Sequence, residues 1–239
     1  MTPEFSIVTP LFNERGSVEA LTREIDAAFE GLAHEIVFVD DSSSDGTDEL
    51  LAVLKGRYSQ MRVIRHRRRS GQSRAIRSGV LAARGEVIVM LDGDGQYDPA
   101  DGARMAKALM AASPDLGMIA GERVDRQDLT HRRVASRLAN FATRWLLASP
   151  TRDSGCGLKA FRREVFLRLP YFDHMHRYLP VLAAREGYAV RVEPITHRPR
   201  PAGVSKYTNW QRILVSIPDI LGVWWLRQRM AAPEGVDEV

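Results

Sequence analysis

Residues 90–99 read MLDGDGQYDP, and this stretch decides how the rest of the chain is interpreted. The apolar run 87–90 predicts a buried strand that continues into Leu91. Asp92 and Asp94 then follow one residue apart, each with a glycine behind it. Two like charges this close cost free energy unless a cation or a proton lies between them. A solvated turn is the simpler alternative, because Asp-Gly pairs are frequent turn formers.

Strand patterns and helix patterns alternate through the first half of the chain. Apolar runs rich in β-branched residues predict five strands: Phe5–Val8, Glu35–Val39, Met61–Ile64, Val87–Leu91 and Leu116–Ala120. Helical spacing of apolar residues lies between them, as at Val18, Leu21 and Ile25. The alternation predicts an α/β fold with a doubly wound, mostly parallel sheet. Ligands of such sheets bind beyond the carboxyl ends of the strands.

The second half of the chain is less regular after about residue 121. The pattern predicts a basic helical stretch at 131–147, a helix around 175–187, a strand at Ala189–Pro194, a basic loop at 197–207 and a final helix at 209–229. We expect one catalytic domain over residues 1–208, an amphipathic helix over 209–230 and a disordered tail over 231–239.

Composition allows a globular protein of 239 residues with a net charge of +4, 44% apolar and 27% charged. The basic residues cluster in RHRRR (65–69) and from Arg198 to Lys206, which suits phosphate, nucleic acid or an anionic membrane surface. The single cysteine, Cys156, excludes an internal disulfide framework and fits a reducing compartment. A small buried hydrophobe is the favoured interpretation of this cysteine over a catalytic thiol.

The sequence predicts no membrane-spanning segment and no signal peptide. The N-terminus is neither basic nor apolar enough for a signal peptide. The longest apolar-rich run, 213–226, contains a proline and an aspartate and falls short of the ~20 residues needed to span a bilayer as a helix. We expect a cytoplasmic protein that is peripherally associated with the cytoplasmic membrane.

The second predicted strand also ends on two carboxylates, Asp40 and Asp41, in VDDSSSDGT. A helix is expected to start at Ser44 or Asp45, and one aspartate would suffice to cap it. The second carboxylate is therefore placed to accept hydrogen bonds from a nucleobase or ribose. The chain has neither GxGxxG nor GxxxxGK[ST], which excludes the dinucleotide and P-loop modes of binding.

The Asp92-Gly93-Asp94 turn is best explained as a metal site. Mg²⁺ and Mn²⁺ take oxygen ligands and are commonly held by one or two carboxylates together with substrate phosphates. The glycines let the backbone approach a ligand closely. The sequence therefore predicts Mg²⁺ or Mn²⁺ as the cofactor.

Taken together, the motifs resemble those of the inverting family-2 glycosyltransferases of the GT-A fold. More narrowly, the chain is similar to polyprenyl-phosphate glycosyltransferases of the dolichol-phosphate mannose synthase type. The matching pieces, in order, are VTPLFNE, VDDSSSDGT, GQSRAIRSGVLAARG, MLDGDGQYDP, DSGCGLKAFRREV and RPAGVSKY. They cover roughly residues 5–207.

The resemblance implies a role for each matching residue. The nucleotide-sugar would be bound by Pro10, Asn13, Glu14, Asp40, Asp41, Gly71, Asp92 and Lys206. The metal and the donor diphosphate would be held by Asp92, Asp94 and Gln96. The acceptor phosphate would be met by Arg123, Arg132, Arg133 and Ser136, with Ser205 a further candidate. Catalysis would rest on Asp94, Arg123, Asp153, Arg200 and Lys206.

The nature of the acceptor decides whether the site needs a base. A lipid phosphate is already anionic near neutral pH and can attack the anomeric carbon directly. A saccharide hydroxyl would have to be deprotonated by a positioned carboxylate, and Asp153 is the candidate. His176 and Arg177 are expected to approach the acceptor side. For Arg132 and Arg133, a solvated basic helix face is the alternative to phosphate binding.

Three functions follow from these observations. The leading one is transfer of a sugar from a GDP- or UDP-linked donor to polyprenyl phosphate at the cytoplasmic membrane face, for cell-envelope glycan or lipid glycosylation. A soluble transferase acting on a saccharide hydroxyl is the alternative within the same class. A nucleic-acid-binding protein is disfavoured, because the basic residues lack interleaved aromatics and the aspartate pairs stay unexplained. No stretch selects the sugar, and self-association is left open.

The end of the chain departs from many lipid-phosphate members of the family, which carry transmembrane helices after the catalytic domain. Here NWQRILVSIPDILGVWWLRQR (209–229) combines apolar residues and tryptophans with arginines near both ends. This composition is typical of an interfacial helix or of one that docks on a membrane partner. A plain core helix is the alternative.

Overall fold

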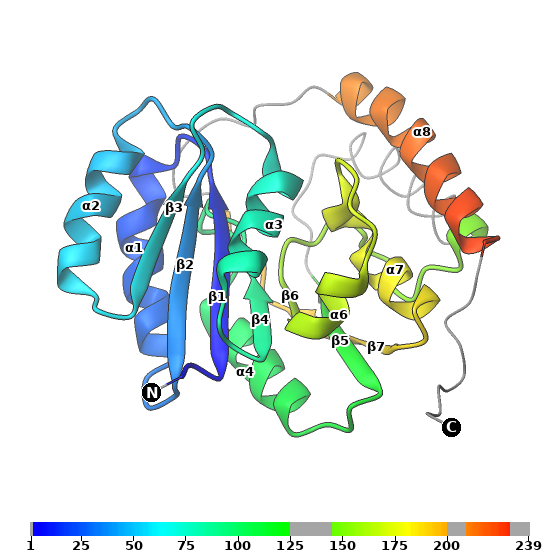
Figure 1. Ribbon diagram of the computed structural model, residues 1–239, viewed down its shortest axis with the longest axis horizontal. Helices are drawn as coiled ribbons and strands as arrows, with labels where there is room; N and C mark the ends of the chain where they lie inside the picture. Colours follow the sequence, from blue (N-terminus) through cyan, green and yellow to red (C-terminus); the bar gives the residue numbers. More distant parts are fainter. Residues whose placement is uncertain (1, 125–144, 200–208, 230–239) are drawn as a thin grey trace, which may run out of the picture.

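The computed structural model describes residues 2–124, 145–199 and 209–229 (Figure 1). Its centre is a seven-stranded sheet in the order β3-β2-β1-β4-β6-β5-β7. The strands are β1 (Phe5–Leu11), β2 (His34–Asp40), β3 (Met61–Arg65), β4 (Val87–Met90), β5 (Leu116–Arg123), β6 (Lys159–Arg162) and β7 (Ala189–Ile195). All run in one direction except β6, which lies antiparallel to both of its neighbours, β4 and β5.

Helices cover both faces of this sheet. They are α1 (Arg15–Ala28), α2 (Thr47–Arg57), α3 (Gln72–Ala82), α4 (Pro99–Met110), α6 (Arg163–Arg168), the 3₁₀ helix η1 (Met175–Arg177), α7 (Leu179–Arg185) and α8 (Asn209–Arg227). In Figure 1 α2 and α8 lie at opposite ends of the molecule, with the sheet between them.

Alternation along the strands builds two cores. Ile7 and Phe38 belong to the cluster that includes residues of α1, α2 and α4. Val8 and Val37, their neighbours in sequence, belong to the cluster that includes residues of α3, α6 and α7. Both faces of the central strands are therefore apolar, as expected for a parallel sheet that is covered on both sides.

The structure confirms the α/β class, the mostly parallel sheet and the five strands predicted in the first half. It also confirms the strand from Ala189 and the final helix. Two predictions were wrong in detail. Helix α2 starts at Thr47, because Gly46 has φ +83° and lies outside the helical region. The helix expected around 175–187 is split into η1 and α7, with Pro180 in the first turn of α7, where its missing N–H is tolerated. Strand β6 and helix α6 were not predicted.

Helix α8 docks through one side and exposes an apolar stripe on the other. Val223 is buried, Asp219 Oδ2 lies 3.1 Å from His174 Nδ1, and Arg185 Nε donates to the carbonyl of Leu226 at 3.0 Å. The stripe, at helical spacing, comprises Ile217, Leu221, Trp224 and Trp225, which are 51%, 54%, 40% and 54% exposed.

In the part of the chain that the structure describes, no helix combines the length and the apolar character needed to cross a membrane. The predicted tail at 231–239 lies outside the described residues, as do most of the predicted basic stretch at 131–147 and residues 200–207 of the basic loop predicted at 197–207.

Candidate active site

The polar strand ends predicted from the sequence meet at one edge of the sheet. Leu11 at the end of β1 pairs with Asp40 at the end of β2, and Val8 pairs with Met90 at the end of β4. Pro10 lies in the same strand, β1. The loops that follow these three strands therefore leave the sheet side by side, as parallel strands require.

The carboxylates after β2 are engaged within the fold. Asp41 accepts hydrogen bonds from the backbone N–H groups of Ser70 and Gly71, at 2.8 Å each, and lies 2.7 Å from His66 Nδ1. Two main-chain donors and a histidine fix this carboxylate in position. Asp41 therefore anchors the SGQS loop, which contains Gly71, beside the end of β2.

Asp40 is fully buried next to it. Its Oδ1 accepts from the backbone N–H of Ser43 at 3.0 Å, and its Oδ2 lies 3.5 Å from Arg65 Nε. Among the described residues Oδ2 has no hydrogen-bond partner. Buried polar atoms are normally hydrogen-bonded, so a donor group of a ligand would be well accommodated here.

The loop after β1 is tied to the loop after β2. Asn13 has φ +55°, its Oδ1 accepts from the N–H of Ser44 at 2.8 Å, and its own N–H donates to Ser43 Oγ at 2.9 Å. The N–H of Glu14 donates to Thr47 Oγ1 at 3.1 Å. Asn13 and Glu14 are thus held beside the carboxylates of the second strand.

The turn 92–96 is packed tightly into the same edge. Gln72 Nε2 donates to Asp92 Oδ1 at 2.8 Å, and the backbone N–H of Gln96 donates to Asp94 Oδ1 at 3.2 Å. A Cβ atom at Gly93 would lie 2.3 Å from Leu11 Cδ2, so a larger residue there would force the leucine side chain or the turn to shift. The glycine serves the close approach of the turn to β1.

This turn fits a divalent cation shared with a ligand rather than one held by protein alone. Across residues 2–124, 145–199 and 209–229, no group of three or more His, Cys, Asp or Glu residues is arranged to hold a metal ion. Asp92 and Asp94 supply two carboxylates on one turn, with the Gln96 amide close in sequence. Mg²⁺ and Mn²⁺ sites that are completed by substrate phosphates need no more than this.

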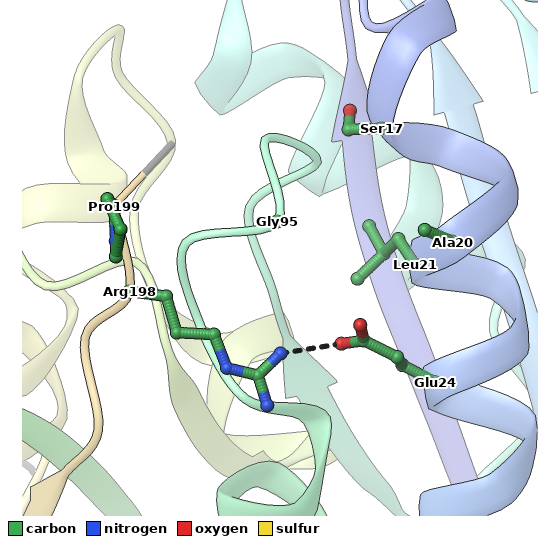
Figure 2. A pocket seen from close by; sticks show the side chains of 7 residues that line it. All are labelled: Ser17, Ala20, Leu21, Glu24, Gly95, Arg198 and Pro199. Atoms are coloured by element: carbon green, nitrogen blue, oxygen red, sulfur yellow. Dashed lines mark hydrogen bonds and ion pairs between the residues drawn. The ribbon is translucent and has the colours of Figure 1, made fainter. Parts of the chain in front are cut away.

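The segment after β7 is bonded to the turn 92–96 and to the residues that follow it. Tyr97 forms a bridge with His197, and the N–H of Arg198 donates to the carbonyl of Gln96 at 2.8 Å. The Arg198 guanidinium pairs with Asp98 and with Glu24, the latter at 2.9 Å. Figure 2 shows Arg198 reaching across to Glu24 on α1. The small cavity there is lined by Ser17, Ala20, Leu21, Glu24, Gly95, Arg198 and Pro199.

Arg123 and Asp153 form a bidentate ion pair. Arg123 Nε donates to Asp153 Oδ2 at 2.6 Å and Nη2 donates to Oδ1 at 2.7 Å, and the side chains are only 13% and 7% exposed. Burial alone would lower the pKa of Arg123. The hydrogen bonds and charge of Asp153 outweigh burial, so the pKa of Arg123 lies above its ordinary value. The structure therefore brings these two predicted residues together, and both oxygens of Asp153 are engaged.

Two further predictions concern Cys156, which is buried, and His176, which is partly buried. Burial raises the pKa of the Cys156 thiol, which disfavours the thiolate and fits the interpretation as a small buried hydrophobe. His176 Nδ1 lies 2.7 Å from Ser73 Oγ, and burial lowers the pKa of His176 well below its ordinary range. His176 therefore packs as a neutral group from η1 against α3.

The RHRRR run is more than a solvated face. Arg65 pairs with Asp48 at 2.9 Å, and the guanidinium of Arg69 lies 4.1 Å from the ring centroid of Phe12. His66, besides contacting Asp41, lies 2.9 Å from Ser78 Oγ through Nε2.

Several residues around the site escaped the sequence analysis. They are His66, Gln72, Tyr97, Lys159 and Arg198. Gln72, Tyr97 and Lys159 lie in the motifs GQSRAIRSGVLAARG, MLDGDGQYDP and DSGCGLKAFRREV, while His66 and Arg198 lie in the two basic clusters, and these stretches were the available signal. Six predicted residues lie outside the described part of the chain: Arg132, Arg133, Ser136, Arg200, Ser205 and Lys206.

Comparison with known proteins shows the family of the chain. Residues 6–169 match the family described as Glycosyl transferase family 2. The chain belongs to this family. It is 34% identical over 236 residues to dodecaprenyl-phosphate galacturonate synthase from Rhizobium johnstonii, covering 96% of this chain and 69% of the relative. It is 31% identical over 207 residues to undecaprenyl-phosphate 4-deoxy-4-formamido-L-arabinose transferase from Aeromonas hydrophila, covering 84% of this chain and 62% of the relative.

Solved structures share the fold at lower identity. A mannosyltransferase from Pyrobaculum calidifontis, in complex with GDP-Man and Mn²⁺, superimposes with a TM-score of 0.67 at 19% identity, over 98% of this chain and 66% of that one. Glucosyl-3-phosphoglycerate synthase from Mycobacterium tuberculosis gives a TM-score of 0.65 at 19% identity, over 94% and 80%. The family-2 glycosyltransferase described here thus has the GT-A fold that its sequence predicts.

Proposed function

We propose that this glycosyltransferase moves a sugar from a nucleotide-sugar to a polyprenyl phosphate, with inversion at the anomeric carbon, at the cytoplasmic face of a membrane. The names of the two relatives support the acceptor class, because both name a polyprenyl phosphate. The structures with GDP-Man or UDP-glucose and Mn²⁺ support a nucleotide-sugar donor and a divalent cation.

The donor half of the site lies after β1, β2 and β4. Pro10, Asn13, Glu14, Asp40, Asp41 and Gly71 would surround the nucleoside. Asp92, Asp94 and Gln96 would hold Mg²⁺ or Mn²⁺ and the diphosphate. When bound, the cation supplies charge neutralisation for the departing nucleoside diphosphate. The protein contributes two carboxylates held in position by Gln72 and by the backbone of Gln96.

The Arg123–Asp153 pair supports a lipid phosphate, rather than a saccharide hydroxyl, as the acceptor. Each oxygen of Asp153 accepts a hydrogen bond from the Arg123 guanidinium, so this carboxylate is placed as the partner of a buried cation, which supports an acceptor that needs no base. A lipid phosphate needs no base and instead needs cations that offset its charge. Arg123 has five N–H donors and uses two of them on Asp153, which leaves donors for an oxygen of the lipid phosphate.

The remaining proposed phosphate contacts come from Arg132, Arg133, Ser136, Arg200, Ser205 and Lys206. Arginine suits bidentate contacts with phosphate and lysine a single charged contact. These assignments rest on the resemblance of the motifs.

Several classes of sugar are candidates for the group that is transferred. The relatives are named for galacturonate and for 4-deoxy-4-formamido-L-arabinose, which brings a uronic acid and a modified amino pentose forward as candidates beside mannose. A role in cell-envelope glycan or lipid glycosylation follows from such products.

Membrane association is proposed through α8. The stripe of Ile217, Leu221, Trp224 and Trp225 is exposed on the outer side of the helix, and Arg227 closes its last turn. Arg229 lies 5.3 Å from the ring centroid of Trp225. Tryptophans and arginines beside an apolar face suit the interface of an anionic membrane, or a small membrane partner. On this view residues 1–208 form the catalytic unit and 209–230 its docking helix.

A direct assay tests the proposal. The protein is incubated with Mg²⁺ or Mn²⁺, a panel of GDP- and UDP-sugars and undecaprenyl phosphate, and the extracted lipid is identified by mass spectrometry. A glycosyl-phosphate lipid with inverted configuration supports it. Transfer only to saccharide hydroxyls, with the lipid unchanged, would replace it by the alternative in which Asp153 acts as base.

A further inference from the structure

Strand β6 carries a buried cation at each end, and only one of them lies at the site. Lys159 opens the strand and is 1% exposed, while Arg162 closes it and is 6% exposed. Because β6 runs antiparallel to its neighbours, Lys159 lies at the carboxyl ends of β4 and β5, opposite Met90 and Ala120. These two strands lead directly to Asp92 and to Arg123.

The side chain of Lys159 points its charge into this buried region. Nζ donates a hydrogen bond to the carbonyl of Cys156. Burial lowers the pKa of Lys159, and the charges of Asp92 and Asp153 act in the opposite direction. A buried ammonium is costly unless it is hydrogen-bonded and close to opposite charge, and Lys159 has both.

The turn 153–157, which Lys159 holds through Cys156, contacts the metal-binding turn. The N–H of Gly157 donates to Tyr97 Oη at 2.9 Å, and a Cβ atom at Gly157 would lie only 2.0 Å from Asp92 Oδ2. At its other end the turn begins with Asp153, which is paired with Arg123. The position of this turn therefore sets the space available to the Asp92 carboxylate.

We propose that Lys159 is a positioning residue that fixes turn 153–157 against Asp92 and so couples the acceptor half of the site to the metal-binding half. The inference rests on the proposed role of Asp92 as a metal ligand. Some residues contact a metal ligand without binding the metal themselves. Their removal typically lowers metal affinity by about 10–100-fold.

The test compares Lys159→Met with Arg162→Met as a matched control. Arg162 is a buried cation on the same short strand, but it binds Glu86 and the carbonyls of Leu109, Ala112, Ser113 and Leu116 at the opposite edge. Three quantities are measured: Mn²⁺ binding in the presence of UDP or GDP by electron paramagnetic resonance, hydrogen–deuterium exchange of peptides covering 151–158, and Tm.

We expect Lys159→Met to weaken Mn²⁺ binding by about tenfold or more and to speed exchange in 151–158. Methionine matches the volume of lysine, so the fold should persist. Arg162→Met should lower Tm and leave Mn²⁺ binding unchanged. Lys159→Arg, which keeps a donor and a positive charge, should bind Mn²⁺ better than Lys159→Met.

Gly157→Ala provides a second measurement if Lys159→Met does not fold. The added methyl group must move either the turn or Asp92, so Mn²⁺ binding should weaken while Lys159 stays in place. Wild-type Mn²⁺ binding and exchange in Lys159→Met, or wild-type Mn²⁺ binding in Gly157→Ala, would overturn the inference. If the wild-type protein itself binds no Mn²⁺ with either nucleotide, the proposed metal site fails instead, which separates the two outcomes.

Discussion

Buried charges occur at both edges of the sheet, and they are arranged differently. At the amino edge Glu35 accepts hydrogen bonds from Ser6 Oγ at 2.8 Å, from the N–H of Arg84 at 2.6 Å and from Arg62 Nη1 at 2.7 Å. At the carboxyl edge five aspartates gather on three loops: Asp40, Asp41, Asp92, Asp94 and Asp153. Burial of a charged group alone therefore does not mark a functional site in this protein.

The balance of signs separates the two edges. Glu35 and Arg162 each face opposite charge and hydrogen-bond partners inside the fold, so their interactions are complete without a ligand. At the carboxyl edge Asp92 and Asp94 stand one residue apart, and Asp40 Oδ2 lacks a hydrogen-bond partner among the described residues. Two carboxylates one residue apart repel each other, and a cation bound together with a nucleoside diphosphate sugar would offset that cost. Substitutions at the two edges should accordingly affect different properties.

The largest effect is expected for Asp94→Asn at the carboxyl edge. Removing a charge that a divalent cation needs should lower kcat by about 10³-fold or more, equivalent to about 4 kcal/mol, with little change in Tm. Activity is measured across a Mn²⁺ titration, with EDTA and re-addition of metal as a reversible control. Wild-type turnover at every metal concentration would remove Asp94 from the metal site.

Asp153→Asn lies at the carboxyl edge but should lower both stability and activity. It leaves buried Arg123 without its counter-charge, which should destabilise the protein by about 3 kcal/mol and lower Tm by roughly 6–12 °C. Transfer to lipid phosphate should also fall, more than hydrolysis of the donor by water.

A double variant identifies the cause of that loss. Adding Arg123→Gln to Asp153→Asn removes the unpaired charge, so Tm should recover while transfer stays low. If the double variant is as unstable as the single one, the loss comes from packing rather than from the unpaired guanidinium.

Glu35→Gln tests the amino edge and should change stability without changing kcat. Burial acts to raise the pKa of Glu35, but the hydrogen bonds from Arg62, Arg84 and Ser6 outweigh it and lower the pKa below its ordinary value of 4.5. A depressed pKa stabilises the folded state above the unfolded-state value, and that stabilisation is lost as pH falls through the folded-state value.

The variant should therefore be about 2 kcal/mol less stable at pH 7, and the difference should shrink below pH 4.5. Urea unfolding across this pH range measures it. A difference that is independent of pH would mean that the carboxylate charge contributes nothing at this position.

The same contrast explains how much the sequence could predict. Strands β1, β2, β4 and β5 are marked by local runs of apolar, β-branched residues, and the aspartate pairs directly follow two of them. Strand β6 has four residues with a cation at each end, and it pairs with segments far away in the chain. Neither its pattern nor its antiparallel direction could be derived from local spacing.

The partners of the site residues were hidden for the same reason. His66 meets Asp41 across 25 positions, Gln72 meets Asp92 across 20, and Arg123 meets Asp153 across 30. Sequence patterns predict which residue types gather at a strand end, whereas these contacts depend on how the loops fold over the edge. The sequence therefore predicted which strand ends carry polar residues and did not predict the contacts that hold the loops together.

The smallest effect is expected on the exposed surface of α8. Leu221→Ser with Trp225→Ser removes two members of the apolar stripe on α8, while Leu81→Ser on α3, where the side chain is 52% exposed, serves as a control. Point variants are preferable to deletion of 209–239, because Val223 and Asp219 contact the core and removal of the helix would uncover it.

Losing the partial burial of these two side chains in a bilayer interface should cost about 1–2 kcal/mol, or roughly tenfold in binding to anionic vesicles. Higher salt should further weaken vesicle binding of the double variant and of the Leu81→Ser control, since each basic residue near the membrane surface contributes about 1 kcal/mol. Vesicle flotation measures binding, and transfer to undecaprenyl phosphate is compared with transfer to a short, water-soluble prenyl phosphate. The double variant should lose activity only with the long-chain acceptor, because that acceptor stays in the bilayer and the short one diffuses to the site. Equal flotation of the double variant, the Leu81→Ser control and the wild type would instead assign the stripe on α8 to contact with another protein.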